Sequence, residues 1–140
     1  MALACDLRVA AVEATLGLPE VRLGLVPGAG GTQRLTRLCG RGIASRLILG
    51  GEIIDGALAE RLGVVQWAQP RERLEEWTRE LAARFAGAPR AALAANKRCM
   101  AAVDRLGREG YAEEVVNSRR LYDDPETRRR VSEFLIRKAI

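Results

Sequence analysis

The hydrophobic pattern of this 140-residue chain changes near residue 70, and this change limits the folds available to it. Before the change, short apolar runs alternate with glycine clusters, which is typical of short strands joined by turns. After it, apolar residues recur every three or four positions, which is the period of an α-helix. The sequence therefore predicts an α/β chain with a strand-containing region over residues 1–70 and a helical region over residues 71–140.

Residues 1–70 are expected to form short elements separated by turns. The spacing of β-branched residues predicts strands over residues 7–12 and 14–17. Pro19 and Pro27 bar helix continuation, so an ordered loop or a single turn is expected around them. The other elements expected here are a helix from residues 28–32 to about Leu38 that stops at Gly40, a helix over residues 43–49, a short helix over residues 57–62 with Asp55 as its N-cap, and a strand over residues 64–68.

Residues 71–140 are expected to form helices throughout. The first carries an apolar stripe from Leu74 to Phe85, and Pro89 is expected as the first residue of the second. A third helix is marked by Tyr111, Val115 and Tyr122, and a terminal helix by the cap Asp124 and the first-turn Pro125, with Val131, Phe134 and Leu135 facing inward.

The composition excludes several kinds of chemistry. The chain has no histidine, which excludes a Ser-His-Asp triad, a Cys-His dyad and a His-ligated zinc within these residues. Three widely spaced cysteines, Cys5, Cys39 and Cys99, fit neither a disulfide framework nor a metal site and are expected to be packing thiols. Any catalysis must therefore use carboxylates, backbone amides or basic side chains.

Neither a membrane nor a nucleic acid is an expected partner. No apolar run approaches the ~18 residues of a membrane span, and the first residues do not resemble a secretory signal, so a cytoplasmic chain is expected. The net charge is +5, but acidic and basic residues are interleaved, and the basic run Arg128–Arg130 contains no aromatic residue. This distribution is typical of solvated helices.

The strongest local signal is the glycine-rich stretch at residues 27–33, Pro-Gly-Ala-Gly-Gly-Thr-Gln. It is not a dinucleotide fingerprint, because Gln33 stands where the third glycine should be, and it is not a P-loop, because no Lys-Ser or Lys-Thr pair follows. Two interpretations remain. The glycines permit close packing, or free amides at the start of a helix hold an oxygen atom.

Glu20 is the second candidate, because it stands in an otherwise apolar stretch from Leu16 to Leu25. If its side chain points inward, such surroundings make it a candidate acid or base. The alternative is an exposed glutamate in a loop.

The same stretch also carries a family resemblance. Ala2–Asp6 and residues 16–35 (Leu-Gly-Leu-Pro-Glu-Val-Arg-Leu-Gly-Leu-Val-Pro-Gly-Ala-Gly-Gly-Thr-Gln-Arg-Leu) resemble the crotonase, or enoyl-CoA hydratase/isomerase, superfamily, and so do Ala57–Val64, Asn96–Arg98 and Phe134–Lys138. The resemblance is to the C-terminal half of that family. It implies the last turn of a ββα spiral in residues 1–70, followed by a helical trimerisation region. Strands whose partners lie in the other half would have open edges, so a stable monomer is not expected.

The resemblance implies a role for particular residues. Glu20 stands at the position of the second catalytic glutamate, which exchanges a proton with the α-carbon of the acyl-CoA, and Gly28 at the position whose amide helps to hold the reacting water. Leu18, Pro19 and Leu23 match walls of the acyl pocket. Lys97 and the terminal Arg137–Lys138 match basic residues that approach the CoA phosphates.

The implied activity is syn hydration of 2-enoyl-CoA thioesters in fatty-acid or related acyl-CoA breakdown, by a trimer or a dimer of trimers. No cofactor is expected, since CoA is part of the substrate. The first catalytic glutamate and both oxyanion amides of the family precede the matched residues, so the chain alone is expected to be weakly active or inactive. The alternatives are an enoyl-CoA δ-isomerase that uses Glu20 alone, and a non-catalytic assembly remnant.

Overall fold

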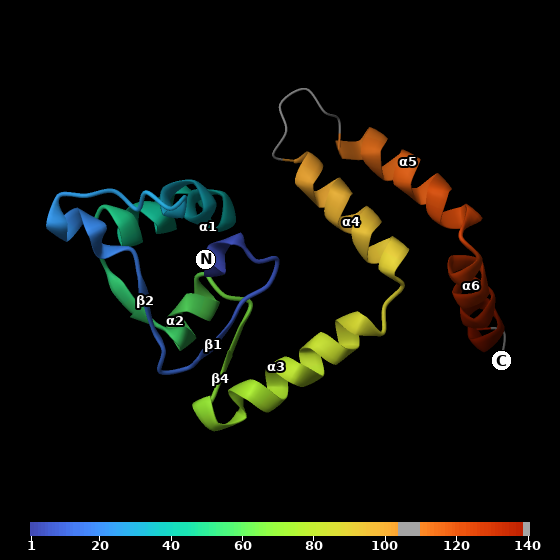
Figure 1. The fold of residues 1–140 in the computed structure, drawn as a ribbon, viewed down its shortest axis with the longest axis horizontal. Helices are drawn as coiled ribbons and strands as arrows, with labels where there is room; N and C mark the ends of the chain where they lie inside the picture. Colours follow the sequence, from blue (N-terminus) through green and yellow to red (C-terminus); the bar gives the residue numbers. More distant parts are fainter. Residues whose placement is uncertain (104–109, 139–140) are drawn as a thin grey trace. The chain divides into compact units, whose positions relative to one another are not determined.

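A computed structural model describes residues 1–103 and 110–138 of the chain. It divides into two compact units, Met1–Glu80 and Leu81–Ile140 (Figure 1). The division lies within helix α3 (Arg71–Ala86), ten residues beyond the boundary expected from the sequence pattern. The two units are described separately.

The first unit contains four short strands in two two-stranded sheets (Figure 1). β1 (Val9–Ala11) pairs in parallel with β4 (Trp67–Gln69), and β2 (Thr15–Gly17) pairs antiparallel with β3 (Ile53–Asp55). Both strands expected in residues 7–17 are therefore confirmed, with shorter bounds. β3 was missed because three residues, the last of which is the N-cap Asp55, are too few to show a strand period.

The strand expected over residues 64–68 begins later, at Trp67, because the preceding residues close a helix. The backbone N–H groups of Val64 and Val65 both donate to the carbonyl of Ala59, at 2.8 and 3.3 Å. Ala59 belongs to α2 (Gly56–Arg61). These amides are therefore not free to join a sheet until the chain has left the end of the helix.

The longest helix, α1 (Gly31–Ile48), is broken at Gly40, as the sequence predicts. Gly40 has φ 77° and ψ 166°, which is not helical. A positive φ of this size favours glycine, because a side chain would meet the neighbouring backbone. Two short 3₁₀ helices, η1 (Ala2–Ala4) and η2 (Pro19–Leu23), precede α1.

The predicted N-cap of α2 is also present. One carboxylate oxygen of Asp55, Oδ1, accepts a hydrogen bond from the backbone N–H of Leu58 at 2.7 Å. This bond satisfies one of the amides that a helix leaves unpaired in its first turn.

Replacing Asp55 by alanine is expected to lower the free energy of unfolding of the first unit by about 1 kcal/mol, because that amide loses its partner. Replacement by asparagine keeps an acceptor oxygen and should cost much less. Urea unfolding followed by tryptophan fluorescence measures both, since Trp67 and Trp77 lie in the first unit with ring centroids 5.4 Å apart. Equal losses for the two variants would contradict the capping role.

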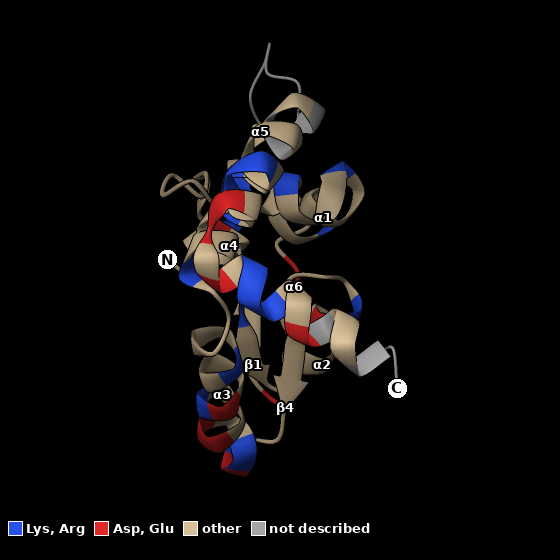
Figure 2. Ribbon diagram, turned by 90° about the vertical axis from the view of Figure 1, so that its right-hand side faces the viewer, with Lys and Arg blue, Asp and Glu red and all other residues tan. Residues whose placement is uncertain are grey.

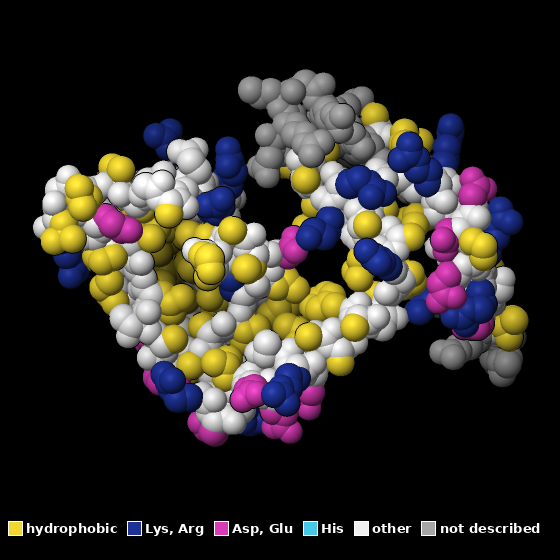
Figure 3. All heavy atoms as spheres, viewed as in Figure 1, with side chains coloured by type: hydrophobic (Ala, Val, Ile, Leu, Met, Phe, Trp, Pro, Cys, Tyr) yellow, Lys and Arg dark blue, Asp and Glu magenta, His cyan; other side chains and the backbone are white. Residues whose placement is uncertain are grey.

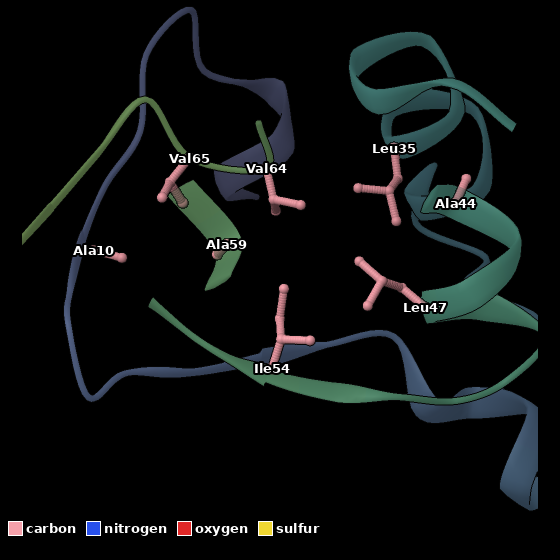
Figure 4. Close-up of a cluster of buried hydrophobic side chains, with 8 residues drawn as sticks. All are labelled: Ala10, Leu35, Ala44, Leu47, Ile54, Ala59, Val64 and Val65. Carbon is pink, nitrogen blue, oxygen red and sulfur yellow. The ribbon is translucent and has the colours of Figure 1, made fainter. Parts of the chain in front are cut away.

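The core of the first unit lies between α1, α2 and the strands. Figure 4 shows Leu35 and Leu47 of α1 pointing toward Ile54 of β3 and Val64. Small residues fill the remaining space, which lets the short elements approach closely. The complete cluster is Ala10, Leu35, Ala44, Leu47, Ile54, Ala59, Val64 and Val65.

The three cysteines are free thiols in different surroundings. Cys39 packs against the core, as expected, and burial raises the pKa of its thiol, while the nearby charge of Arg8 lowers it. Cys99 is half-buried. Cys5 is exposed, so the expectation of a packing thiol is wrong there.

Helix α3 carries the alternating charges expected of a solvated helix, with basic and acidic side chains interspersed along it (Figure 2). One exposed pair joins Arg79 Nη2 to Glu75 Oε1 at 2.6 Å. Such exposed pairs contribute little to stability.

The second unit consists of the end of α3 and the helices α4 (Arg90–Ala102), α5 (Gly110–Asp123) and α6 (Pro125–Lys138). Asn117 of α5 is buried, and its Oδ1 accepts from Arg98 Nη2 of α4 at 2.9 Å. The cap expected for α6 is confirmed, because Asp124 Oδ1 accepts from the N–H of Thr127 at 3.0 Å. Pro89 is the N-cap of α4 rather than its first residue.

The inward face expected on α6 is not covered. Val131 is 43% exposed and Leu135 is 59% exposed, so this prediction is wrong for the chain as it stands. The Phe134 side chain lies outside the described residues, as does that of Tyr111. An amphipathic pattern predicts that a helix has an apolar face, but it does not say which chain supplies the surface that covers it.

Candidate active site

The first unit contains a cavity of about 690 Å³. Its walls come from η1, β1, β2, the start of α1 and the buried segment Val64–Val65. Figure 3 shows hydrophobic side chains gathered in the hollow of this unit. The cavity therefore offers a mainly apolar site with a few polar groups, which is the usual composition of a small-molecule pocket.

Glu20 supplies the carboxylate of this cavity. It is the only acidic residue among those that line it, and it lies on η2. Its Oε2 is buried and is the only buried side-chain nitrogen or oxygen without a hydrogen-bond partner in the described parts of the chain. Since buried polar atoms are normally paired, this oxygen is available to a ligand. Of the two interpretations of Glu20, the structure supports the inward one.

The local sequence explains why the Glu20 side chain is held there. Pro19 fixes the first turn of η2, and Gly24 ends it with φ 70°. The backbone N–H of Leu25 then donates to the carbonyl of Glu20 at 3.0 Å. The carboxylate is therefore presented from a short, closed turn rather than from an open loop.

The glycines after Pro27 have different roles. Gly30 is the N-cap of α1 with φ 82°. A Cβ on Gly31 would lie 2.7 Å from Pro27 Cβ and 3.1 Å from Leu18 Cδ1, so the start of α1 packs against these residues only because no side chain intervenes. The close contacts at Gly31 support the packing interpretation, and both glycines also line the cavity. Gly28 is exposed and is not among the lining residues.

The structure brings together only some of the residues implied by the resemblance. Leu18 lines the cavity beside Glu20. Pro19 is half-buried but is not a lining residue, and Leu23 is 77% exposed and lies outside the lining set. Lys97 is exposed on α4 of the second unit. Glu20 and Leu18 are thus the predicted site residues found at the cavity.

Two basic residues of the cavity wall were not anticipated. Arg34, on the first turn of α1, is exposed and donates from Nη1 to the carbonyl of Ala29 at 2.9 Å. Arg8 is buried, with only 8% of its surface exposed. In the sequence, Arg8 is a single charged residue at the start of an apolar strand, and this position could have indicated a buried charge. Because charged residues are interleaved along much of the chain, the position did not stand out.

The closed turn, the buried carboxylate and the glycine-rich helix start all lie within the region that resembles crotonases. The model of the family described as "Enoyl-CoA hydratase/isomerase" matches residues 1–138. The chain belongs to the enoyl-CoA hydratase/isomerase family. The resemblance noted from residues 16–35 is therefore confirmed.

Individual family members show the same similarity. The 2,3-dehydroadipyl-CoA hydratase of Escherichia coli is 42% identical over 100 residues, which cover 71% of this chain and 39% of that protein. The short-chain-enoyl-CoA hydratase of Clostridioides difficile is 46% identical over 82 residues, which cover 59% of this chain and 53% of that protein.

A solved structure supports the fold. The enoyl-CoA hydratase of Bacillus anthracis superposes with a TM-score of 0.89 and 34% identity, and the match covers 96% of this chain and 53% of that one. The α/β fold of the family is thus shown for this chain. The chain spans about half the length of the relatives that it matches.

Within the described residues, no helix combines the length and apolar character needed to cross a bilayer.

Proposed function

We propose that this chain supplies the Glu20 side of an enoyl-CoA hydratase active site, for syn hydration of 2-enoyl-CoA thioesters. The observation that carries the proposal is the buried, unpaired Oε2 of Glu20 in a mainly apolar cavity of about 690 Å³. A carboxylate without an internal partner can exchange a proton with a bound substrate. The names of the relatives, which are hydratases of CoA thioesters, support this substrate class.

The other requirements of hydration suggest roles for further residues. Hydration needs a positioned water, a proton for the α-carbon, and donors that stabilise charge on the thioester oxygen. We assign the proton to Glu20, a contact with the water to the Gly28 amide, and the acyl-chain wall to Leu18 with Pro19 and Leu23. Pro19, Leu23 and Gly28 do not line the cavity of this chain, so their contributions require surfaces supplied by another part of the assembly.

The second unit is proposed to serve assembly, as a trimer or a dimer of trimers, and binding of CoA. Val131, Leu135 and Ile136 of α6 are exposed apolar side chains, which supports a partner surface there. Lys97 is assigned to the CoA phosphates, since an exposed ammonium suits that contact. CoA enters as part of the substrate, and no separate cofactor is proposed.

The 140-residue chain by itself is expected to have little or no hydratase activity. Loss of one oxyanion donor costs about 10²- to 10³-fold in rate, and the family resemblance implies that the two donors and the first glutamate belong to the other half of the family's fold. The measurement is the loss of enoyl-thioester absorbance with crotonyl-CoA, beside a full-length relative as the reference. Turnover near that of the reference would contradict this expectation.

An enoyl-CoA δ-isomerase is the second candidate, and one observation favours it. Glu20 is the only carboxylate among the residues that line the cavity, and a double-bond shift needs one group to move a proton between two carbons. Incubation with a 3-enoyl-CoA distinguishes the candidates. Conversion to the 2-enoyl isomer without hydration would favour the isomerase.

A further inference from the structure

Arg8 is a buried charge to which the proposed chemistry gives no role. It is the only charged side chain that is buried among the described residues. A buried guanidinium is costly unless its N–H groups are paired, so its partners indicate what it holds together.

The Arg8 side chain bonds to three residues in two segments of the first unit. Nε donates to the carbonyl of Val64 at 2.8 Å, Nη2 donates to Oε1 of Gln66 at 3.0 Å, and Nη1 donates to the carbonyl of Cys5 at 2.6 Å. The backbones of Arg8 and Gln66 add two bonds, from Arg8 N to Gln66 Oε1 and from Gln66 N to Arg8 O, both at 3.0 Å. Arg8 is thus joined to the Val64–Gln66 segment by several hydrogen bonds and to Cys5 by one.

Cys5 is the C-cap of η1, the short helix that forms one wall of the Glu20 cavity. Its N–H donates to the carbonyl of Ala2 at 3.1 Å, and the N–H of Ala4 donates to the carbonyl of Met1 at 2.9 Å, so these bonds stay within η1. Residues Met1 to Cys5 all line the cavity. The bond from Arg8 therefore joins this wall to the Val64–Gln66 segment.

We propose that Arg8 is a positioning residue that holds the η1 wall of the cavity in place. The planar guanidinium directs N–H groups toward Cys5, Val64 and Gln66 at the same time. A lysine ammonium carries the same charge but is a point on a flexible stem and does not reproduce this fork. Shape rather than charge is what the site requires of residue 8.

The bonds of Arg8 affect two separate properties of the chain. The first is the order of η1, which is a property of the free chain. The second is the affinity of the cavity for an acyl-CoA thioester, and this part rests on the proposed function.

The test compares Arg8→Lys with the control Gln66→Leu in the 140-residue chain. Gln66→Leu removes the acceptor of the bonds from Arg8 Nη2 and Arg8 N but leaves the bonds from Arg8 to Cys5 and Val64. Amide hydrogen exchange at Ala4 and Cys5 should be roughly tenfold faster in Arg8→Lys and within about twofold of the unmodified chain in Gln66→Leu. Unchanged exchange in Arg8→Lys, or equal acceleration in both variants, would overturn the proposal.

Calorimetric titration with crotonyl-CoA supplies a readout that a purely structural role would not move. Arg8→Lys should weaken binding at least about fivefold, and Gln66→Leu should bind as the unmodified chain does, although both lose stability. If the proposed function is wrong, no variant binds but the exchange contrast persists. If the positioning role is wrong, the two variants bind alike.

The unmodified chain gives a measurement that does not depend on either variant folding. The Nε proton of Arg8 is buried and bonded, so it should exchange at least about tenfold more slowly than that of the exposed Arg79. Equal exchange of the two protons would overturn the proposal.

Discussion

Replacing Glu20 by glutamine is expected to lower kcat for crotonyl-CoA hydration by about 10²- to 10⁴-fold, the range associated with loss of one general acid or base. Glutamine preserves the size of the side chain, so the cavity keeps its shape. It does not exchange a proton at the α-carbon. Because the substitution removes chemistry rather than binding surface, KM should change little.

The measurement needs an assembly whose turnover is high enough for a decrease of about 10²- to 10⁴-fold to be detected. A suitable protein joins the part of the Bacillus anthracis enoyl-CoA hydratase that lies outside the match to residues 1–140 of this chain, since the match covers 96% of this chain and 53% of that one. Glu60→Gln in the same chimera is the matched control, because Glu60 is an exposed glutamate of α2 outside the cavity lining. If both variants retain the turnover of the parent chimera, the assignment of Glu20 is wrong.

Replacing Gly56 by alanine is expected to lower the free energy of unfolding of the first unit by about 3 kcal/mol or more, at the upper end of overpacking effects. Gly56 is the first residue of α2 and lies against β1. Its N–H donates to the carbonyl of Val12 at 2.9 Å, and an added Cβ would overlap the carbonyl of Ala11. Both neighbours are backbone atoms, so no side chain can turn away to make room.

Gly42→Ala is the control for this substitution. A Cβ at Gly42, within α1, would meet nothing within 4 Å. Alanine has a higher helix propensity than glycine, so this variant should be as stable as the unmodified chain or more stable by up to about 1 kcal/mol. Urea unfolding at one protein concentration, followed by tryptophan fluorescence, compares the two. Similar stability for both variants would show that α2 and β1 can separate at little cost.

Local signals predicted most of the elements correctly because their causes are local. The cap at Asp55, the cap at Asp124 and the break at Gly40 depend on residues a few positions apart, and all three are present. β3 was missed and β4 was placed too early, because strand pairing and the end of α2 depend on distant backbone partners.

The candidate site was predictable in part. The apolar stretch around Glu20 and the glycine-rich helix start pointed to the correct loop, and the family resemblance assigned it a role. The sequence did not decide between an inward and an exposed carboxylate, since both fit the same residues. Arg8 was not predicted at all, because its partners Val64 and Gln66 lie more than fifty residues away.

The order of the residues was enough to predict the family, the α/β class and the helical character of residues 71–140. These predictions rest on periodicity, capping and motif spacing, which are properties of neighbouring residues. Only the tertiary structure decided that Glu20 Oε2 is buried without a partner, that Arg8 joins η1 to Val64 and Gln66, and that the apolar face of α6 is exposed. Burial and the pairing of polar groups depend on which distant segments meet. These contacts form only when the chain folds, so the order of the residues does not show them.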